Sequence, residues 1–423
     1  MQSSVFSRLG GRLRPAGLWR HPGFLRLWWA TTVSRFGSEV TLLALPLLAA
    51  LVLDASPAQM GLLLAAFTAP FLVIGLLVGV WVDRVRRAPL LVFSDLARAA
   101  LLAAVPVGWA AGWLSMGLVY AVALGVGALT VVFEVSSLSL LPALIGREHL
   151  VEGNGKLEAS RSLAQIGGPG LAGALVGLLG APLAVLLDAA SYVVSATFLK
   201  TLNVPDKPRT EPDAPASPRR VLREAGEGLR TVFAHRLLRP LVLCSATNNF
   251  SGLVFFAVYV LYMTEDLGLG PSAVGLVFSL GGLGALLGAL VAGPASRRFG
   301  AGPAMAGAMV LCGLSGMAIP LAVAAPAVAL PMVLAAEFGQ WFFLVVYRVV
   351  EVSVRQTITP DHLQGRVNAT ERFVVYGVIP IGALLGGFLG EAAGVRVALI
   401  AGMLGMLAAS LWLLFSPVRS MRS

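Results

Sequence analysis

Residues 27–53 read LWWATTVSRFGSEVTLLALPLLAALVL, an apolar stretch in which only Arg35 and Glu39 carry charge. A helix needs about 20 mostly apolar residues to cross a bilayer, so this stretch is long enough to span one. Comparable stretches follow along the chain, near 59–82, 89–110, 117–141, 160–179, 181–200, 240–263, 272–293, 303–323, 327–350, 367–389 and 393–415. The sequence therefore predicts an all-α polytopic membrane protein with twelve transmembrane helices.

The composition supports this class. Of the 423 residues, 57% are hydrophobic and only 12% are charged, whereas about 25% of the residues of a soluble protein are charged. The formal net charge of +10 does not indicate a nucleic-acid partner, because the arginines are spread over separate loops and form no continuous patch. Cys244 and Cys312 lie in separate spans, and the four histidines show no ligand spacing. We therefore expect no disulfide framework, no metal site and no cofactor.

The distribution of lysine and arginine predicts the orientation. These residues are concentrated in the N-terminus, in every second loop, in the central segment and in the C-terminus. Because cytoplasmic loops carry the excess of positive charge, both termini are predicted to be cytoplasmic, with the protein in the inner membrane. Arg396 is the exception to the pattern.

The central segment divides the chain into two halves. Its first part is rich in proline and acidic residues and cannot bury a core. Apolar residues then recur at helical spacing from Val221 to Phe233, which predicts an amphipathic helix along the cytoplasmic leaflet. The predicted regions are a basic cytoplasmic N-terminus (1–26), an N-terminal six-helix bundle (27–200), a cytoplasmic linker with this helix (201–239), a C-terminal six-helix bundle (240–415) and a cytoplasmic tail (416–423).

The two halves share a pattern. Gly79, Asp83 and Arg84 lie at the cytoplasmic end of the second span, and Gly293 and Arg297 occupy the same relative places after the eighth. Two parallel repeats of six helices give two pseudo-symmetric bundles. This is the architecture of a transporter whose halves rock against each other.

One motif carries a family resemblance. The segment Gly79-Val-Trp-Val-Asp83-Arg84-Val-Arg86-Arg87 resembles motif A (G-x-x-x-D-R-x-G-R) of the major facilitator superfamily, except that Arg86 stands where the family usually has glycine. Further segments, among them Asp188-Ala-Ala-Ser191, resemble the enterobactin-exporter and macrolide-efflux branch. The resemblance covers the chain from Phe24 to the C-terminus. It implies the major facilitator fold and proton-driven export of drugs or siderophore-like molecules.

Two carboxyl groups inside the spans are candidates for proton coupling. Glu39 lies near the middle of the first span, four residues after Arg35 and therefore on the same helix face. Burial favours the neutral form of a carboxyl group and a nearby cation favours the charged form. Glu134 lies about two-thirds of the way along the fourth span, where a charge should face a cavity or a partner. Structural ion pairs are the alternative, for Glu134 with Arg161 or Arg35.

A second set of residues is predicted to line a substrate cavity. A polar and aromatic wall suits an amphipathic ligand. Alternatively, Asn248 and Asn249 could equally hold two helices together, and Trp341 alone would be a packing residue. The set comprises Arg35 in the first span, Asn248 and Asn249 in the seventh, and Glu337, Gln340 and Trp341 in the tenth.

Three further charged residues are expected to form structural pairs. Asp95 and Arg98 lie three residues apart in the third span, and Asp188 lies in the sixth. The family resemblance implies that these two spans are peripheral.

A cytoplasmic gate is predicted from the resemblance and from helix electrostatics. Asp83 ends the second span, and the eleventh begins after Arg366. A carboxylate near a helix N-terminus is stabilised by the helix dipole, and an arginine adds a charge-assisted bond. The resemblance implies that this contact holds the outward-facing state shut on the cytoplasmic side; a solvated loop network is the alternative. The predicted gate residues are Gly79, Asp83, Arg84, Arg87, Arg348, Glu351 and Arg366, and Arg355 shares a helix face with two of them.

The function predicted from these features is proton-coupled secondary transport. The protein would export drug-like or siderophore-like small molecules by alternating access, with protons, the substrate and membrane lipids as its partners, and as a monomer. Two alternatives stay open: a proton-coupled uptake symporter for a polar nutrient, and a non-transporting membrane receptor. An enzyme is not expected, because no nucleophile, base and oxyanion site can be assembled and no phosphate-binding loop is present.

Overall fold

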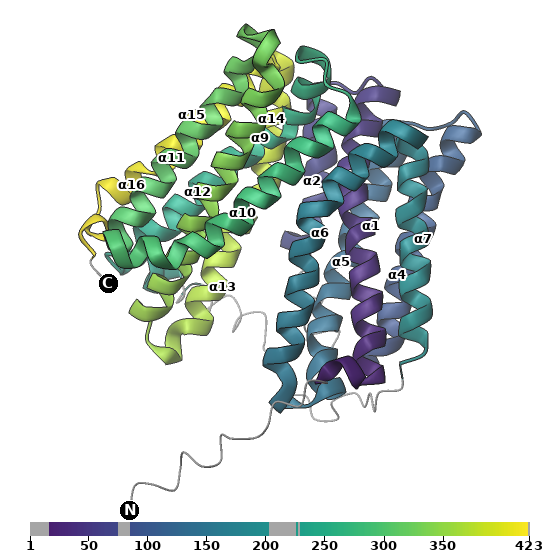
Figure 1. Cartoon of the computed structure of the whole chain (residues 1–423), viewed down its shortest axis with the longest axis horizontal. Helices are drawn as coiled ribbons and strands as arrows, with labels where there is room; N and C mark the ends of the chain where they lie inside the picture. Colours follow the sequence, from purple (N-terminus) through teal and green to yellow (C-terminus); the bar gives the residue numbers. More distant parts are fainter. Residues whose placement is uncertain (1–16, 75–84, 203–225, 227–228, 422–423) are drawn as a thin grey trace, which may run out of the picture.

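The computed structural model describes residues 17–74, 85–202, 226 and 229–421. This part of the chain is almost entirely helical and contains no strand, and Figure 1 shows its helices in two bundles. The N-terminal half comprises α1 (Pro22–Val52), α2 (Pro57–Val73), α4 (Arg87–Ala110), α5 (Met116–Ile145), α6 (Leu150–Leu179) and α7 (Ala181–Lys200). The C-terminal half comprises α9 (Leu238–Leu261), α10 (Pro271–Phe299), α11 (Ala301–Leu321), α12 (Ala329–Ile358), α13 (Asp361–Gly377), α14 (Ile379–Ala393), α15 (Val395–Ala409) and α16 (Leu411–Leu414).

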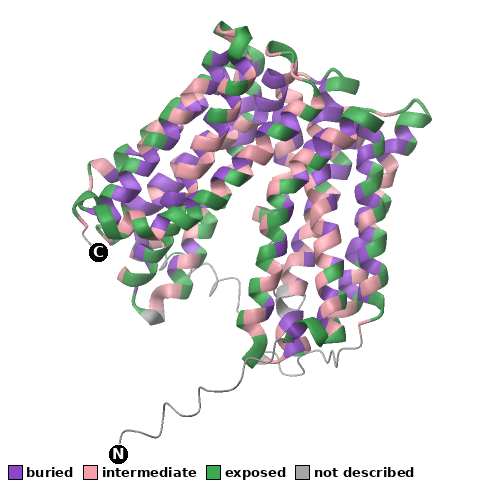
Figure 2. Ribbon diagram, in the orientation of Figure 1, coloured by how far each residue is buried: buried purple, intermediate pink, exposed green. Residues whose placement is uncertain are grey.

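The helices have the length and the surface of an integral membrane protein. Within the described residues, eleven helical segments are long and apolar enough to cross a membrane, and α2 adds a shorter apolar helix over Pro57–Leu72. Large apolar side chains are exposed on the outside of both halves, as at Leu163 and Phe388, and Figure 2 shows exposed residues along the helix surfaces. Such a surface is suited to hydrocarbon rather than water. The predicted fold class is therefore confirmed.

Short connections hold neighbouring helices together. A capping box starts α2: the Ser56 hydroxyl accepts from the Gln59 amide, and the Gln59 side chain accepts from the Ser56 amide at 3.0 Å. Gly180 is the only residue between α6 and α7, and Gly394 is the only residue between α14 and α15. Both have positive φ, 83° and 99°, a conformation that favours glycine. These turns force the paired helices to run antiparallel.

Several helices differ from their predicted spans at the ends. α6 begins at Leu150 rather than near 160, and α12 continues to Ile358 rather than ending near 350. Hydropathy detects only the part of a helix that faces lipid, whereas charged helix formers such as Glu152 and Lys156 continue the helix beyond it. The eleventh span is divided at Val378 into α13 and α14, because Pro380 lacks the amide that a continuous helix would use. The predicted amphipathic helix of the linker lies mostly outside the described residues.

The two halves contact each other mainly through two helix crossings. α2 packs against α14, and α6 packs against α10. A Cβ on Gly61 would lie 2.8 Å from the Cα of Gly387, and a Cβ on Gly173 would lie 2.9 Å from the Cα of Gly275. Only glycine permits backbones to approach so closely.

The crossings lie near one end of the molecule, which we call the closed end. It carries the connections α1–α2, α6–α7, α9–α10 and α14–α15. Towards the opposite end, where α1 and α4 begin and α12 ends, the two halves diverge (Figure 1). We call this the open end.

Candidate functional site

A cavity of about 160 Å³ lies inside the N-terminal half. Five helices contribute to its wall, and charged side chains come from four of them. The lining residues are Ser34, Arg35, Ser38, Glu39, Thr41 and Leu42 of α1, Phe67 and Phe71 of α2, Arg98 of α4, Val126, Thr130, Phe133 and Glu134 of α5, and Asp188 and Tyr192 of α7. We call it the charged cavity. Its volume is sufficient for several water molecules.

An ion pair crosses the charged cavity from α1 to α5. Arg35 Nη2 lies 2.9 Å from Glu134 Oε1, and each side chain is about one-third exposed. Arg35 is therefore the partner of Glu134, and the alternative partner, Arg161, lies 4.0 Å from Glu158 on its own helix. The two predicted residues meet because α1 and α5 present them to the same space.

Glu39 lines the same cavity but has a different environment. Among the described residues, no cation lies within 4.0 Å of its carboxylate and no donor is hydrogen-bonded to it. Its stem is held by α6: a Cβ on Gly168 would lie 2.4 Å from the Glu39 Cβ. The helix backbone thus fixes where the Glu39 side chain leaves α1, while the carboxyl group remains half-buried at the cavity wall.

A buried cluster forms the wall of the cavity on the α4 and α7 side. Asp95 and Arg98 form an ion pair and are 0% and 3% exposed. The Arg98 guanidinium lies between two rings, 4.5 Å from the centroid of Phe133 and 4.1 Å from that of Tyr192. Such stacking on aromatic faces is favourable for a desolvated arginine.

Asp188 is the second carboxylate of this cluster. It is 0% exposed and accepts hydrogen bonds from Thr41 Oγ1 of α1 and, at 2.9 Å, from Ser191 Oγ. The predicted pairing of Asp95 with Arg98 is present. Arg98 and Asp188 also line the charged cavity together with Glu39, so they are in reach of its contents as well as of their structural partners. α4 and α7 lie beside the cavity since α7 packs against both α1 and α4.

The predicted substrate residues of the C-terminal half lie around a third buried carboxylate. Glu337 is 2% exposed; it accepts from the Tyr259 hydroxyl at 3.0 Å and from Trp341 Nε1 at 2.9 Å. Gln340 Nε2 lies 3.6 Å from the sulfur of Met406. No lysine or arginine of the described residues pairs with Glu337, so only neutral donors contact its carboxyl group.

Two asparagines lie on α9. Asn248 is 3% exposed, and its Oδ1 has no hydrogen-bond partner within the described part of the chain. Asn249 donates to the Ser245 carbonyl at 2.9 Å and accepts from Arg348 at 3.3 Å. Asn249 therefore joins α9 to α12, and Arg348 is exposed beside it. The role of all these residues in substrate binding stays a prediction.

The predicted gate is described only in part. Gly79, Asp83 and Arg84 lie outside the described residues, Arg87 begins α4, and Arg366 is exposed on α13. In the C-terminal half, Arg355 joins two carboxylates: its Nε lies 3.1 Å from Glu351, and its Nη1 lies 3.0 Å from Glu371 of α13. This ion-pair network connects α12 to α13 within one half.

Sequence reasoning missed several residues of these clusters, among them Tyr192, Glu371 and Tyr259. Tyr192 follows Asp188 by four residues and so shares its helix face, a signal that could have identified it. Glu371 lies in the polar beginning of the predicted eleventh span, 367–389, where a carboxylate is unremarkable. Tyr259 lies in the apolar run 253–262, where an aromatic side chain is ordinary packing, so no signal distinguished it.

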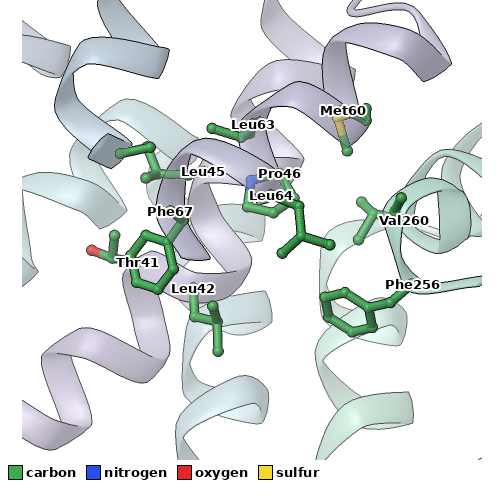
Figure 3. A pocket seen from close by; sticks show the side chains of 12 residues that line it. Thr41, Leu42, Leu45, Pro46, Met60, Leu63, Leu64, Phe67, Phe256 and Val260 are labelled. Carbon is green, nitrogen blue, oxygen red and sulfur yellow. The ribbon is translucent and has the colours of Figure 1, made fainter. Parts of the chain in front are cut away.

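A second, smaller pocket of about 40 Å³ lies between the halves towards the closed end. Figure 3 shows its wall, formed by side chains of α1, α2, α5 and α9. All of its lining side chains are apolar except one, Thr41. We call it the apolar pocket.

Comparison with known proteins identifies the family. Residues 15–423, which are nearly the whole chain, match the model of a family described as "transmembrane secretion effector". The chain belongs to this family. It is an integral membrane transporter of the major facilitator type and not an enzyme.

This chain is similar to proteins that carry a functional name. It is 29% identical to the "multidrug efflux pump Tap" of Mycolicibacterium fortuitum, over 94% of this chain and 96% of the relative. It is 28% identical to the protein of the same name in Mycobacterium tuberculosis, over 90% of each chain. It is also 25% identical to an uncharacterised transporter of the major facilitator type from Bacillus subtilis, over 77% of this chain and 76% of the relative.

Solved structures agree on the fold. A bacterial homologue of the iron transporter ferroportin in its inward-facing state superposes with a TM-score of 0.72 at 19% identity, covering 94% of this chain and 98% of that one. The same homologue in its outward-facing state gives a TM-score of only 0.56, covering 93% of this chain and 98% of that one. By this measure the chain superposes better on the inward-facing structure than on the outward-facing one.

Proposed function

We propose that this transporter exports drug-like or siderophore-like small molecules across the inner membrane in exchange for protons. In this proposal both termini are cytoplasmic, the open end faces the cytoplasm and the closed end faces away from it. The loops at the open end carry most of the lysines and arginines, which supports this orientation. The relatives named as multidrug efflux pumps support export.

Proton exchange is proposed from one observation, the unpaired carboxyl group of Glu39 beside the Arg35–Glu134 ion pair. A carboxylate that has its own arginine keeps its charge, whereas one that lacks a close cation is neutralised at low cost by a proton. We therefore assign proton binding first to Glu39. In this proposal, the charge of Glu39 determines whether Glu134 stays paired with Arg35.

The transport cycle follows from the shape of the two halves. Substrate enters from the open end and contacts the charged cavity; Asn248, Asn249, Glu337, Gln340 and Trp341 are proposed as the opposite wall. In this proposal the predicted gate residues, among them Asp83, Arg87 and Arg366, hold the open end shut in the outward-facing state. A ligand shifts this equilibrium only by its difference in affinity for the two states. Protonation of Glu39 changes the difference in affinity between the two states for a cationic or polar substrate.

The test uses energised inside-out membrane vesicles and a fluorescent pH dye. Tetraphenylphosphonium, erythromycin and enterobactin are added separately, and proton release from the vesicles is recorded. We compare the wild type with Glu39→Gln and with Glu158→Gln, a matched control whose side chain is 67% exposed on α6. We expect one of the compounds to collapse the gradient in the wild type and in Glu158→Gln but not in Glu39→Gln.

Other outcomes are informative. An equal response of the wild type and Glu39→Gln would contradict the assignment of Glu39 and leave export intact. Uptake of a polar nutrient in right-side-out vesicles, driven by an inward proton gradient, would instead identify a symporter.

A further inference from the structure

The charged cavity holds more negative than positive groups. Four carboxyl groups and two guanidinium groups line it or bond to its lining: Glu39, Asp95, Glu134 and Asp188 against Arg35 and Arg98. Glu134 pairs with Arg35, and Asp95 pairs with Arg98. Two carboxyl groups, Glu39 and Asp188, remain without an arginine of their own in the described part of the chain. Two unpaired buried carboxylates are costly unless they bind protons.

Asp188 is the more deeply buried of the two. Its side chain is fully enclosed, and the donors that contact it, Thr41 and Ser191, are neutral hydroxyls. Hydroxyl groups both donate and accept, so they can bond either form of the carboxyl group by rotating. The site therefore accommodates Asp188 with or without a proton.

The charged and titratable groups around Asp188 come from its own helix, from α1 and α4, and from the α5 side of the cavity. They are Tyr192 of α7, Arg35 and Glu39 of α1, Asp95 and Arg98 of α4, and Glu134 of α5. Arg98 is the nearest cation to act on Asp188, and it is already bonded to Asp95. Its charge cannot fully compensate both carboxylates.

Thr41 connects Asp188 to both pockets. The side chain lines the charged cavity and is also the only polar side chain on the wall of the apolar pocket. Figure 3 shows its hydroxyl beside Phe67 at the edge of that pocket, and the same hydroxyl donates to Asp188. One carboxyl group is thus linked through one hydroxyl to a space on the open-end side and to a space between the halves on the closed-end side.

We propose that Asp188 is a second proton-binding site of this transporter, loaded and emptied through Thr41, in addition to Glu39. The inference rests on the proposed proton exchange and extends it. A proton from water binds the Asp188 carboxylate on one side of the membrane and returns to water on the other. The exchanger then carries two protons in each cycle, one on each unpaired carboxyl group.

The first test needs no substrate. Purified protein is titrated with acid and base while infrared difference spectra record the C=O stretch of protonated carboxyl groups. We compare the wild type, Asp188→Asn, Glu39→Gln and Asp54→Asn, a matched control at an exposed position of positive φ, which asparagine tolerates. We expect Asp188→Asn and Glu39→Gln each to lose a different titrating band, and Asp54→Asn to keep both.

An unchanged spectrum in Asp188→Asn would overturn the proposal, because Asp188 would then keep one protonation state. Asp188→Glu guards against a folding defect: it keeps the carboxyl group, so the band should move in frequency rather than disappear. A titrating band at the wild-type frequency in Asp188→Glu would also overturn the assignment.

The second test counts protons. Calorimetry in buffers of different ionisation enthalpy gives the protons released when tetraphenylphosphonium binds. We expect about twice as many protons from the wild type as from Asp188→Asn, and equal numbers would contradict a second site. Absence of binding to the wild type would count against the proposed export, whereas the carboxyl bands are read without any ligand, so the two failures are distinguishable.

Discussion

At the scale of single residues, the charged cavity gives different surroundings to ionisable residues that look alike in the sequence. Arg35, Glu39 and Glu134 are all ionisable residues in apolar spans, and spacing along one helix suggested that Arg35 faces Glu39. In the fold, Arg35 bonds to Glu134, 99 residues away, and Glu39 has no ion-pair partner within 4.0 Å among the described residues. Which of two candidate carboxylates is paired depends on a contact between helices, and this information is absent from the periodicity of either helix.

Gly168 provides a test of how Glu39 is positioned. A Cβ at this position would lie 2.4 Å from the Glu39 Cβ, whereas a Cβ on the neighbouring Gly167 would lie 3.7 Å from Phe36, an ordinary contact. We expect Gly168→Ala to lower the unfolding free energy by about 1–3 kcal/mol, as overpacking does, and to reduce proton-coupled transport.

Gly167→Ala is the matched control for this change. It should leave both properties close to those of the wild type. The measurements are reversible unfolding in detergent micelles and proton release from vesicles. Equal effects of the two alanines would show that the position of Glu39 is not set by this contact.

At the scale of helices, the sequence predicted most elements but not their ends or their crossings. Within the described residues, the predicted apolar stretches are helical, because backbone groups in hydrocarbon must bond within the segment. The extension of α6 to Leu150 and the division at Val378 follow from local helix chemistry that hydropathy ignores. The crossings of α6 with α10 and of α2 with α14 depend on glycines whose abundance in the sequence indicated close packing without identifying the partners.

The α6–α10 crossing leads to a prediction about conformational preference. A Cβ on Gly275 would lie 2.4 Å from the Pro169 carbonyl oxygen and 2.9 Å from the Cα of Gly173, and backbone cannot move aside as a side chain can. We expect Gly275→Ala to separate α6 from α10 and to reduce the population with a closed end.

Spin labels on introduced cysteines at Trp113 and Val328, exposed positions of the two halves at this end, would report longer distances in the variant. Gly307→Ala is the control, because no atom lies within 4 Å of its Cβ position. An unchanged distance distribution in Gly275→Ala would contradict this view of the crossing.

At the scale of the whole molecule, the fold class was predictable and the state of the molecule was not. The bilayer limits a chain of this composition to helices, and the repeated motif predicted two related halves. Nothing in the sequence favours one position of the halves, because both states of a rocking transporter use the same residues. The position of the halves is known only from the fold. They meet at the closed end, and the TM-score is 0.72 to an inward-facing structure and 0.56 to an outward-facing one.

Access to the charged cavity tests the orientation. Cys244 and Cys312 are fully buried, so a cysteine introduced at Ser38, which lines the cavity, should dominate labelling. We expect Ser38→Cys to react with a membrane-impermeant maleimide faster in inside-out vesicles than in right-side-out ones, and the wild type to react in neither. The reverse order would contradict the proposal that the open end faces the cytoplasm.

The single-glycine turns at Gly180 and Gly394 also bear on how this transporter can be handled experimentally. Turns this tight leave little backbone to protrude, so antibody fragments raised against the purified protein should not bind at these two turns. At the open end, α12 and α13 are held together by the ion pairs of Arg355 with Glu351 and Glu371. A rigid helical fusion for electron microscopy, or a reporter inserted for imaging, is best joined at that fastened corner.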